Sequence, residues 1–414
     1  MKKQFRHVML LSVAAIGSLM LASCSDSDAP ALDGITDAPL ERINLDIEQM
    51  EYVGNSASFS VKLWHAINAM PEYEKSNFII SPLSLQINLA LLANGASDET
   101  LKTLTDVILP DCTNPSLAKL NELNSLLIEK LPQTDRNAKY KMANSVWHCI
   151  DMYDDYISRV NRYYNASVFE FDGATNEAKK AINEWLAAAT DGGINEYLQN
   201  PPKEQVLFLS ALQFKHGWTK KFEKSDTKLE DFYCESGEVV KVPMMCKVDE
   251  LAEIRTHEKS MRAIVPFGNK AFTLHLIKPD EGYSVDEALE EFTKGEYYTR
   301  TLKLKMPRFS LETEIDFLDI LCSMGLENAF KGTPDYSAMT STDFEIRDFR
   351  QKSKLEVDED GAVYKVVTSS GGVGDTALGP PPPIVEFYLD HPFAFEIHES
   401  STGVIIAMGK VCNL

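Results

Sequence analysis

Residue types that often carry out catalysis are present, but their spacing favours no catalytic arrangement. The chain has 8 histidines, and none of them forms HExxH or a pair at helical spacing that would hold zinc. No serine lies in a GxSxG turn, the usual nucleophile of a hydrolase. Gly372 to Ala377 satisfies a GxGxxA dinucleotide pattern, but Pro380 to Pro383 prevent the helix that would bind a pyrophosphate. The sequence therefore predicts no enzyme, no cofactor and no metal site.

The N-terminus has the pattern of an export signal. Basic residues precede the apolar run from Val8 to Leu21, which is short for a membrane span of about 20 residues. The letters LASC, ending at Cys24, resemble a bacterial lipobox, which implies cleavage before Cys24 and lipidation of its thiol. An ordinary signal peptide followed by a coincidental cysteine is the alternative. We therefore expect a signal peptide over 1–23, a tether over 24–50, and an outer-membrane lipoprotein facing the cell surface or the periplasm.

Charge and the other cysteines exclude further classes of protein. The net charge of −21, with no basic stripe, argues against nucleic acid as a partner. Six cysteines remain beside Cys24, and none has the CxxC or CxxH spacing of a zinc site. Some of them could pair in an exported protein, but scattered buried thiols are the simpler interpretation.

Helices are expected mainly in the first half of the chain and strands in the second. Helical patterns cover 56–70, 81–96 and 180–190, and Ser81 with Pro82 forms a typical helix start. Strand-like runs cover 205–214, 238–245, 261–267, 271–277, 301–309, 384–389 and 403–411. This distribution predicts an α+β fold with large antiparallel or mixed sheets and surrounding helices.

Separate stretches, taken in order, resemble the serpin family over nearly the whole chain from residue 51. They are 77–104, 143–147, 182–194, 209–222, 304–330 and 390–414. The resemblance implies a single serpin domain over 51–414 and a monomer. It also implies that the segment over about 359–385, before the DHPF letters at Asp390, is an exposed reactive-centre loop.

The same resemblance implies a protease inhibitor that acts as a suicide substrate. A serine or cysteine protease would cut the loop, form a covalent acyl complex, and be trapped when the loop inserts into a sheet. The alternative is a non-inhibitory serpin that binds a partner or is merely cleaved.

The hinge of the loop carries over to Glu359, Gly361, Ala362, Tyr364, Val366 and Thr368. Because side chains alternate along a strand, the last four of these share one face, which would be buried on insertion. Tyr364 is bulky where the family prefers alanine, and overfilling a packed slot costs about 1–3 kcal/mol.

Two further groups of residues carry over from the family. Trp218, Arg308 and Glu359 occupy the breach, where an ion pair closes the top of the sheet. Ser81, Ser84, Ser210 and Gln351 occupy the shutter, a cluster that gates strand separation. Ser210 and Gln351 replace the usual Asn and His, and a hydrogen bond between them is predicted to substitute.

The family spacing, counted from Glu359, places the scissile bond at Asp375–Thr376, within a window from Val373 to Leu378. No Lys or Arg lies between Thr368 and Leu378, so a trypsin-like pocket finds no anchor there. Elastase-like, subtilisin-like or papain-like proteases are the expected targets, and a protease that prefers an acidic residue, such as Asp375, is the alternative.

Overall fold

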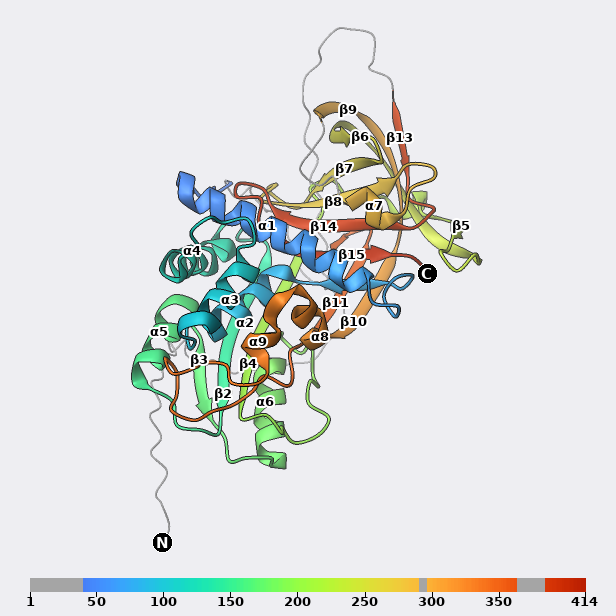
Figure 1. Cartoon of the computed structure of the whole chain (residues 1–414). Helices are drawn as coiled ribbons and strands as arrows, with labels where there is room; N and C mark the ends of the chain where they lie inside the picture. Colours follow the sequence, from blue (N-terminus) through green and yellow to red (C-terminus); the bar gives the residue numbers. More distant parts are fainter. Residues whose placement is uncertain (1–39, 290–295, 363–383) are drawn as a thin grey trace, which may run out of the picture. The chain divides into compact units, whose positions relative to one another are not determined.

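The computed structural model describes residues 40–289, 296–362 and 384–414 (Figure 1). Several predicted sites lie outside these residues: Cys24, Tyr364, Val366, Thr368, and the bond Asp375–Thr376 with its window.

The folded part of the chain begins before residue 51. Helix α1 (Ile47–Asn68) starts with a capping box in which Asp46 and Gln49 exchange side-chain-to-backbone hydrogen bonds. Ile43 is buried, and its N–H donates to the Ser401 hydroxyl at 2.9 Å. The predicted tether over 24–50 is therefore too long at its C-terminal end, because apolar burial and helix capping already act from Ile43 onward.

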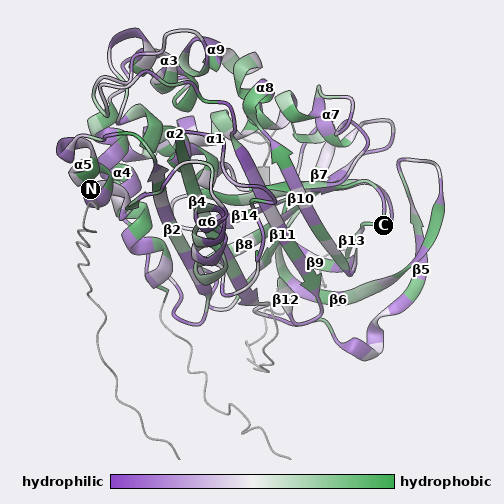
Figure 2. Cartoon of the chain, turned by 90° about the horizontal axis from the view of Figure 1, so that it is seen from below, coloured by the Kyte–Doolittle hydropathy of each residue, from purple (hydrophilic) through white to green (hydrophobic). Residues whose placement is uncertain are grey.

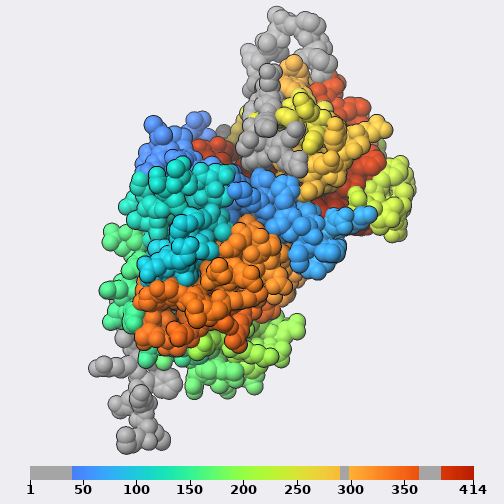
Figure 3. Space-filling view, viewed as in Figure 1, coloured from blue at the N-terminus to red at the C-terminus, as the bar shows by residue number. Residues whose placement is uncertain are grey.

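Most of the helices lie on one side of the domain, whereas α7 lies beside strands of the second sheet (Figure 1). The helix α2 (Pro82–Ala93) is buried along its whole length, begins at the N-cap Ser81, and forms the centre of this layer. Figure 3 shows the orange residues of the α8–α9 region adjoining the cyan residues of α3. The other helices are α3 (Asp98–Ile108), α4 (Leu117–Lys130), α5 (Asp154–Tyr164), α6 (Asn176–Ala189), α7 (Val285–Leu289), α8 (Leu318–Leu321) and α9 (Glu327–Phe330).

A six-stranded sheet carries the predicted hinge. Its order is β10-β11-β12-β4-β2-β3, and its pairs are antiparallel except for β2 with β3. Its strands are β10 (Phe309–Asp316), β11 (Arg350–Asp358), β12 (Gly361–Ala362), β4 (Val206–Gly217), β2 (Lys139–His148) and β3 (Ser167–Glu170). Hydrophobic and hydrophilic residues alternate along β10 (Figure 2), as expected for a strand with one buried face.

A nine-stranded mixed sheet packs against the first. Its main path is β1-β15-β14-β8-β7-β6-β9-β13, and β5 pairs with β6. The strands are β1 (Phe78–Ile80), β15 (Ile405–Val411), β14 (Phe393–Glu399), β8 (Phe272–Pro279), β7 (Ser260–Pro266), β6 (Val239–Thr256), β9 (Glu296–Pro307), β13 (Val385–Tyr388) and β5 (Lys228–Tyr233). The predicted α+β class is confirmed.

Aromatic residues between the two sheets hold them together. Phe309 of β10 lies 5.9 Å from Phe393 and 5.7 Å from Phe395, both of β14, measured between ring centroids. All three are at most 5% exposed, so their burial stabilises the sheet packing by about 1.5–3 kcal/mol each. Within the described ranges, no helix is both long and apolar enough to span a membrane.

Candidate functional site

The first residues of the hinge form a strand inside the six-stranded sheet. In β12, Ala362 pairs with Val357 of β11 on one side and with His216 of β4 on the other. The Ala362 side chain is 1% exposed, so its position is inward-facing, as the alternation of the hinge predicts. Gly361 fits only without a side chain, because a Cβ there would lie 2.2 Å from the His216 carbonyl oxygen. The hinge thus enters the sheet between β4 and β11.

Beyond Ala362 the facing edges of β4 and β11 are unpaired. No strand in the described part of the chain pairs with β4 over 206–215 on the side away from β2, or with β11 over 350–356 on the side away from β10. A cavity of about 130 Å³ lies here, lined by 209–214 of β4, 350–356 of β11 and the start of α2. We call this space the slot. Unpaired strand edges are receptive to another strand, so the slot can accept one.

Polar atoms along the slot lack partners. Among the described residues, no hydrogen-bond partner meets the buried hydroxyls of Ser210 and Ser84 or the buried side-chain carbonyl oxygens of Asn88 and Gln213. Each of these residues lines the slot. A buried polar group without a partner costs about 1–3 kcal/mol, so a strand that supplied hydrogen bonds here would relieve an existing penalty.

The predicted breach pair is present. Arg308 binds the Glu359 carboxylate with two N–H groups, Nε to Oε2 at 3.2 Å and Nη2 to Oε1 at 2.5 Å. The Thr227 hydroxyl donates to the same carboxylate at 2.7 Å. Burial alone would raise the pKa of Glu359, but the hydrogen bonds from Arg308 and Thr227 hold it below its ordinary value. The carboxylate is therefore charged at neutral pH and fixes the chain next to β12.

Trp218 holds the same segment through its backbone and its ring. Its N–H donates to the Asp360 carbonyl at 3.1 Å, and its indole Nε1–H donates to the Asp358 carbonyl at 2.8 Å. The indole stacks on Phe267, with ring centroids 4.6 Å apart. The structure thus brings Trp218, Arg308 and Glu359 together at the entrance of β12.

A buried lysine lies over the breach. The Lys247 ammonium lies 5.5 Å from the Trp218 ring centroid and 4.6 Å from that of Phe222, and it donates to the Lys220 carbonyl. Burial lowers the pKa of Lys247 to about 8. Sequence reasoning missed this residue, because no pattern indicates which of many lysines is desolvated.

The shutter residues come together, but in a different hydrogen-bond pattern from the one predicted. Gln351 accepts from the Ser81 N–H at 2.7 Å and donates to the Ser81 carbonyl at 3.0 Å, so it ties β11 to the start of α2. The Ser81 hydroxyl donates to the Ile406 carbonyl and accepts from the Ser84 N–H. The predicted hydrogen bond between Ser210 and Gln351 is wrong, because the Gln351 amide already bonds to both backbone groups of Ser81, and the Ser210 hydroxyl has no partner in the described part of the chain.

A buried His–Asp pair borders the hinge and was also missed. His216, the cross-strand partner of Ala362, contacts Asp135 with Nε2 and Oδ2 2.7 Å apart. Asp135 also accepts from the backbone N–H groups of Asn269 and Asn137. The pair joins distant parts of the chain, so only the fold could reveal it.

A sheet with a hinge entering between two separable strands defines a class of protein that accommodates an additional strand. Comparisons with known proteins identify the family. The family model described as "Serpin (serine protease inhibitor)" matches residues 54–414, and the chain belongs to this family. Membership of a family of protease inhibitors also confirms the prediction that the chain is not an enzyme.

The relatives are distant in sequence but similar in structure. An uncharacterized serpin-like protein of Thermococcus kodakarensis is 26% identical over 82% of this chain and 81% of its own length. Iripin-8 of Ixodes ricinus is 27% identical over 83% of this chain and 90% of its own length. The crystal structure of the thermophilic serpin Tengpin in its native state has a TM-score of 0.77 at 27% identity, covering 93% of this chain and 99% of Tengpin.

Proposed function

We propose that this protein inhibits proteases as a suicide substrate, by inserting the cleaved reactive-centre loop into the slot. One observation carries the proposal: β12 already lies between β4 and β11, and both strands have unpaired edges beyond it. A strand that begins in register at Gly361 and continues past Ala362 would extend directly into the slot.

Continuing the register of β12 assigns a partner to each hinge residue. Tyr364 would lie between Phe214 of β4 and Leu355 of β11, on the same inward face as Ala362. Both strands line the cavity at these positions. The space beside Phe214 and Leu355 is therefore where the bulk of Tyr364 is accommodated, at a cost of about 1–3 kcal/mol if the slot is overfilled.

The next two inward positions suit the groups that they meet. Val366 would lie between Leu212 of β4, an apolar neighbour, and Ser353 of β11. Thr368 would lie between Ser210 and Gln351, where the Ser210 hydroxyl now has no partner. The Thr368 hydroxyl would satisfy it, which adds roughly 1 kcal/mol to the burial of the strand.

The chemistry needs no cofactor. The protease hydroxyl or thiol gives up its proton and attacks the carbonyl carbon of Asp375, the bond to Thr376 breaks, and the new amine leaves with that proton. An ester or thioester remains and would normally be hydrolysed by water. Insertion of about fifteen residues moves the acylated protease on the order of 50 Å and distorts its active site before hydrolysis.

The target class follows from the loop sequence. Val373, Ala377 and Leu378 are small or apolar, and Asp375 is the only charged residue from Thr368 to Leu378. We propose elastase-like, subtilisin-like or papain-like targets. Mass spectrometry of the released C-terminal peptide tests this, and a peptide beginning at Val366 with trypsin efficiently trapped would contradict it.

A gel with a panel of proteases tests the inhibitory function. We expect an adduct that survives SDS, since the acyl bond is covalent, together with loss of protease activity. Clean cleavage without an adduct, for every protease that cuts the loop, would refute inhibition and favour the non-inhibitory alternative.

We further propose that the protein is held at the outer membrane by a lipid on Cys24, on the strength of the LASC pattern after a short apolar run. A Cys24→Ala variant should lose membrane association while the parent chain partitions with membranes. Equal partitioning of both proteins would contradict the anchor.

A further inference from the structure

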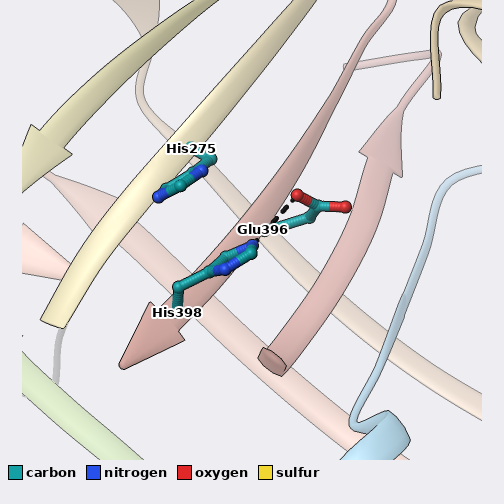
Figure 4. A group of neighbouring side chains, drawn as sticks. All are labelled: His275, Glu396 and His398. Atoms are coloured by element: carbon teal, nitrogen blue, oxygen red, sulfur yellow. Dashed lines mark hydrogen bonds and ion pairs between the residues drawn. The ribbon is translucent and has the colours of Figure 1, made fainter. Parts of the chain in front are cut away.

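Three side chains that can bind metal gather on the nine-stranded sheet, away from the slot. Glu396 and His398 lie two residues apart on β14, so they share one face of the sheet. His275 of β8 is the direct cross-strand partner of Glu396. Figure 4 shows the two imidazole rings and the carboxylate side by side, with the contact between His398 and Glu396 drawn as a dashed line.

Glu396 is the residue that most needs a partner. It is 0% exposed, and one carboxylate oxygen, Oε2, lies 3.1 Å from His398 Nε2. The other oxygen, Oε1, has no hydrogen-bond partner among the described residues. Burying a carboxylate is costly unless it is paired or coordinates a metal. The cluster therefore contains a buried carboxyl oxygen without a hydrogen-bond partner beside two imidazoles.

We propose that His275, Glu396 and His398 form a zinc-binding site. One ligand atom from each residue lies within 4.8 Å of the other two, and this is the one such group of three in the described ranges. Zinc binds imidazole nitrogen and carboxylate oxygen at about 2.0–2.2 Å, so these atoms must approach one another by only a small amount. The two rings stack with centroids 4.0 Å apart and planes 7° apart. The nitrogen lone pairs of two parallel rings cannot both point at one ion, so one ring must tilt when the ion binds.

The surroundings set the preferred ion and its ligands. The Thr273 hydroxyl lies 3.1 Å from Nε2 of His275, which leaves Nδ1 of that ring for the metal. Arg262 and Arg255 contribute positive charges that act on His275 and oppose a cation. The negative charge of Glu396 is therefore essential to the site. Two nitrogens and one oxygen favour zinc over magnesium or calcium, which prefer oxygen ligands.

The sequence alone predicts no metal site because the ligands come from strands far apart in the chain. Only the register between β8 and β14 brings His275 opposite Glu396. The pattern Glu-x-His is common in strands and indicates little without its cross-strand neighbour.

Equilibrium dialysis of the purified chain against Zn²⁺, with metal quantified by mass spectrometry, tests the site. We expect one Zn²⁺ per chain, and loss of that ion in Glu396→Gln and His398→Gln. Thr273→Val should weaken binding about 10–100-fold, since it removes only the hydroxyl that orients His275. His391→Gln is the matched control, because His391 is an exposed histidine that contacts Asp390, and it should bind as the parent does.

Cobalt substitution gives a second measurement that needs no variant. Co²⁺ bound by nitrogen and oxygen should give visible absorption bands without a thiolate charge-transfer band. A thiolate band would assign the metal to a cysteine and overturn the proposal. Absence of stoichiometric Zn²⁺ in the parent chain, or its retention in both Glu396→Gln and His398→Gln, would do the same. None of these outcomes depends on protease inhibition.

Discussion

Replacing Thr368 by Arg tests whether the hinge enters the slot in the register that β12 begins. If the pairing of Ala362 with Val357 and His216 continues, residue 368 lies between Ser210 and Gln351 on the inward face. No carboxylate lines the slot near these two residues, and the Gln351 amide is already bound to Ser81. An arginine there would be buried without a counter-charge.

The expected effect is large. An unpaired buried charge costs about 3 kcal/mol or more. If most of this cost appears in the barrier to insertion, the insertion rate falls by roughly 100-fold or more, because each 1.4 kcal/mol is about tenfold. Hydrolysis of the acyl bond is unchanged, so the partition between trapping and turnover shifts by the same factor. The variant should therefore be cleaved as a substrate.

The assay compares three proteins with one protease that the parent traps. Thr368→Val is the matched control, because it keeps the size and the β-branch and loses only a hydroxyl worth about 1 kcal/mol. The number of inhibitor molecules consumed per trapped protease should rise slightly for Thr368→Val and steeply for Thr368→Arg. Undiminished trapping by Thr368→Arg would refute insertion in this register.

Three further predictions concern stability. Lys247→Met should raise the melting temperature at pH 7. This gain in stability over the parent should shrink between about pH 8 and 10.5, because the folded parent loses the Lys247 proton at a lower pH than the unfolded chain does. A gain that does not depend on pH would contradict the lowered pKa of Lys247. Glu359→Gln should lower the free energy of unfolding by roughly 1–2 kcal/mol at pH 7, a modest figure because Arg308 is half exposed. Urea titrations should show this difference between variant and parent vanish as the pH falls through the lowered pKa of Glu359. Cleavage within the loop should raise the melting temperature sharply through added ladder hydrogen bonds and apolar burial, and an unchanged value after a verified single cut would favour a non-inhibitory protein.

Sequence reasoning succeeded where a residue's role depends on local pattern or on a motif. The start of α2 at Ser81 and Pro82 follows from capping chemistry. The pairing of Arg308 with Glu359 was expected from family position, and the structure brings the two side chains together. In both cases the motifs, in their order along the chain, identify the residues that interact.

Sequence reasoning failed where several possible hydrogen-bond partners compete for one polar group. A hydrogen bond from Ser210 to Gln351 was chemically reasonable, but the Gln351 amide bonds instead to both backbone groups of Ser81. Sequence lists the donors and acceptors without their distances, so it cannot rank such alternatives. The same limit hid the pair of His216 with Asp135 and the cluster around Glu396, whose members meet only through tertiary register.

If the loop inserts as we propose, chain length requires cleavage before full insertion as long as β13 stays paired with β9. Between Ala362 and Ile384 the chain has only the residues 363–383, and its far end continues into β13, which pairs with β9 at Leu302 to Lys305. The hinge end is held close to the end of β9, because Glu359 binds Arg308. If inserted residues advance about 3.3 Å each, an equal length of uncut chain must return, and more chain must span from Arg308 to the start of β13 opposite Leu302, so fewer than about ten residues can enter. Insertion would then stop before residue 372, and so before Asp375. Cutting at or beyond Asp375 removes the return path, and the unpaired edges of β4 and β11 can then accept the rest of the strand.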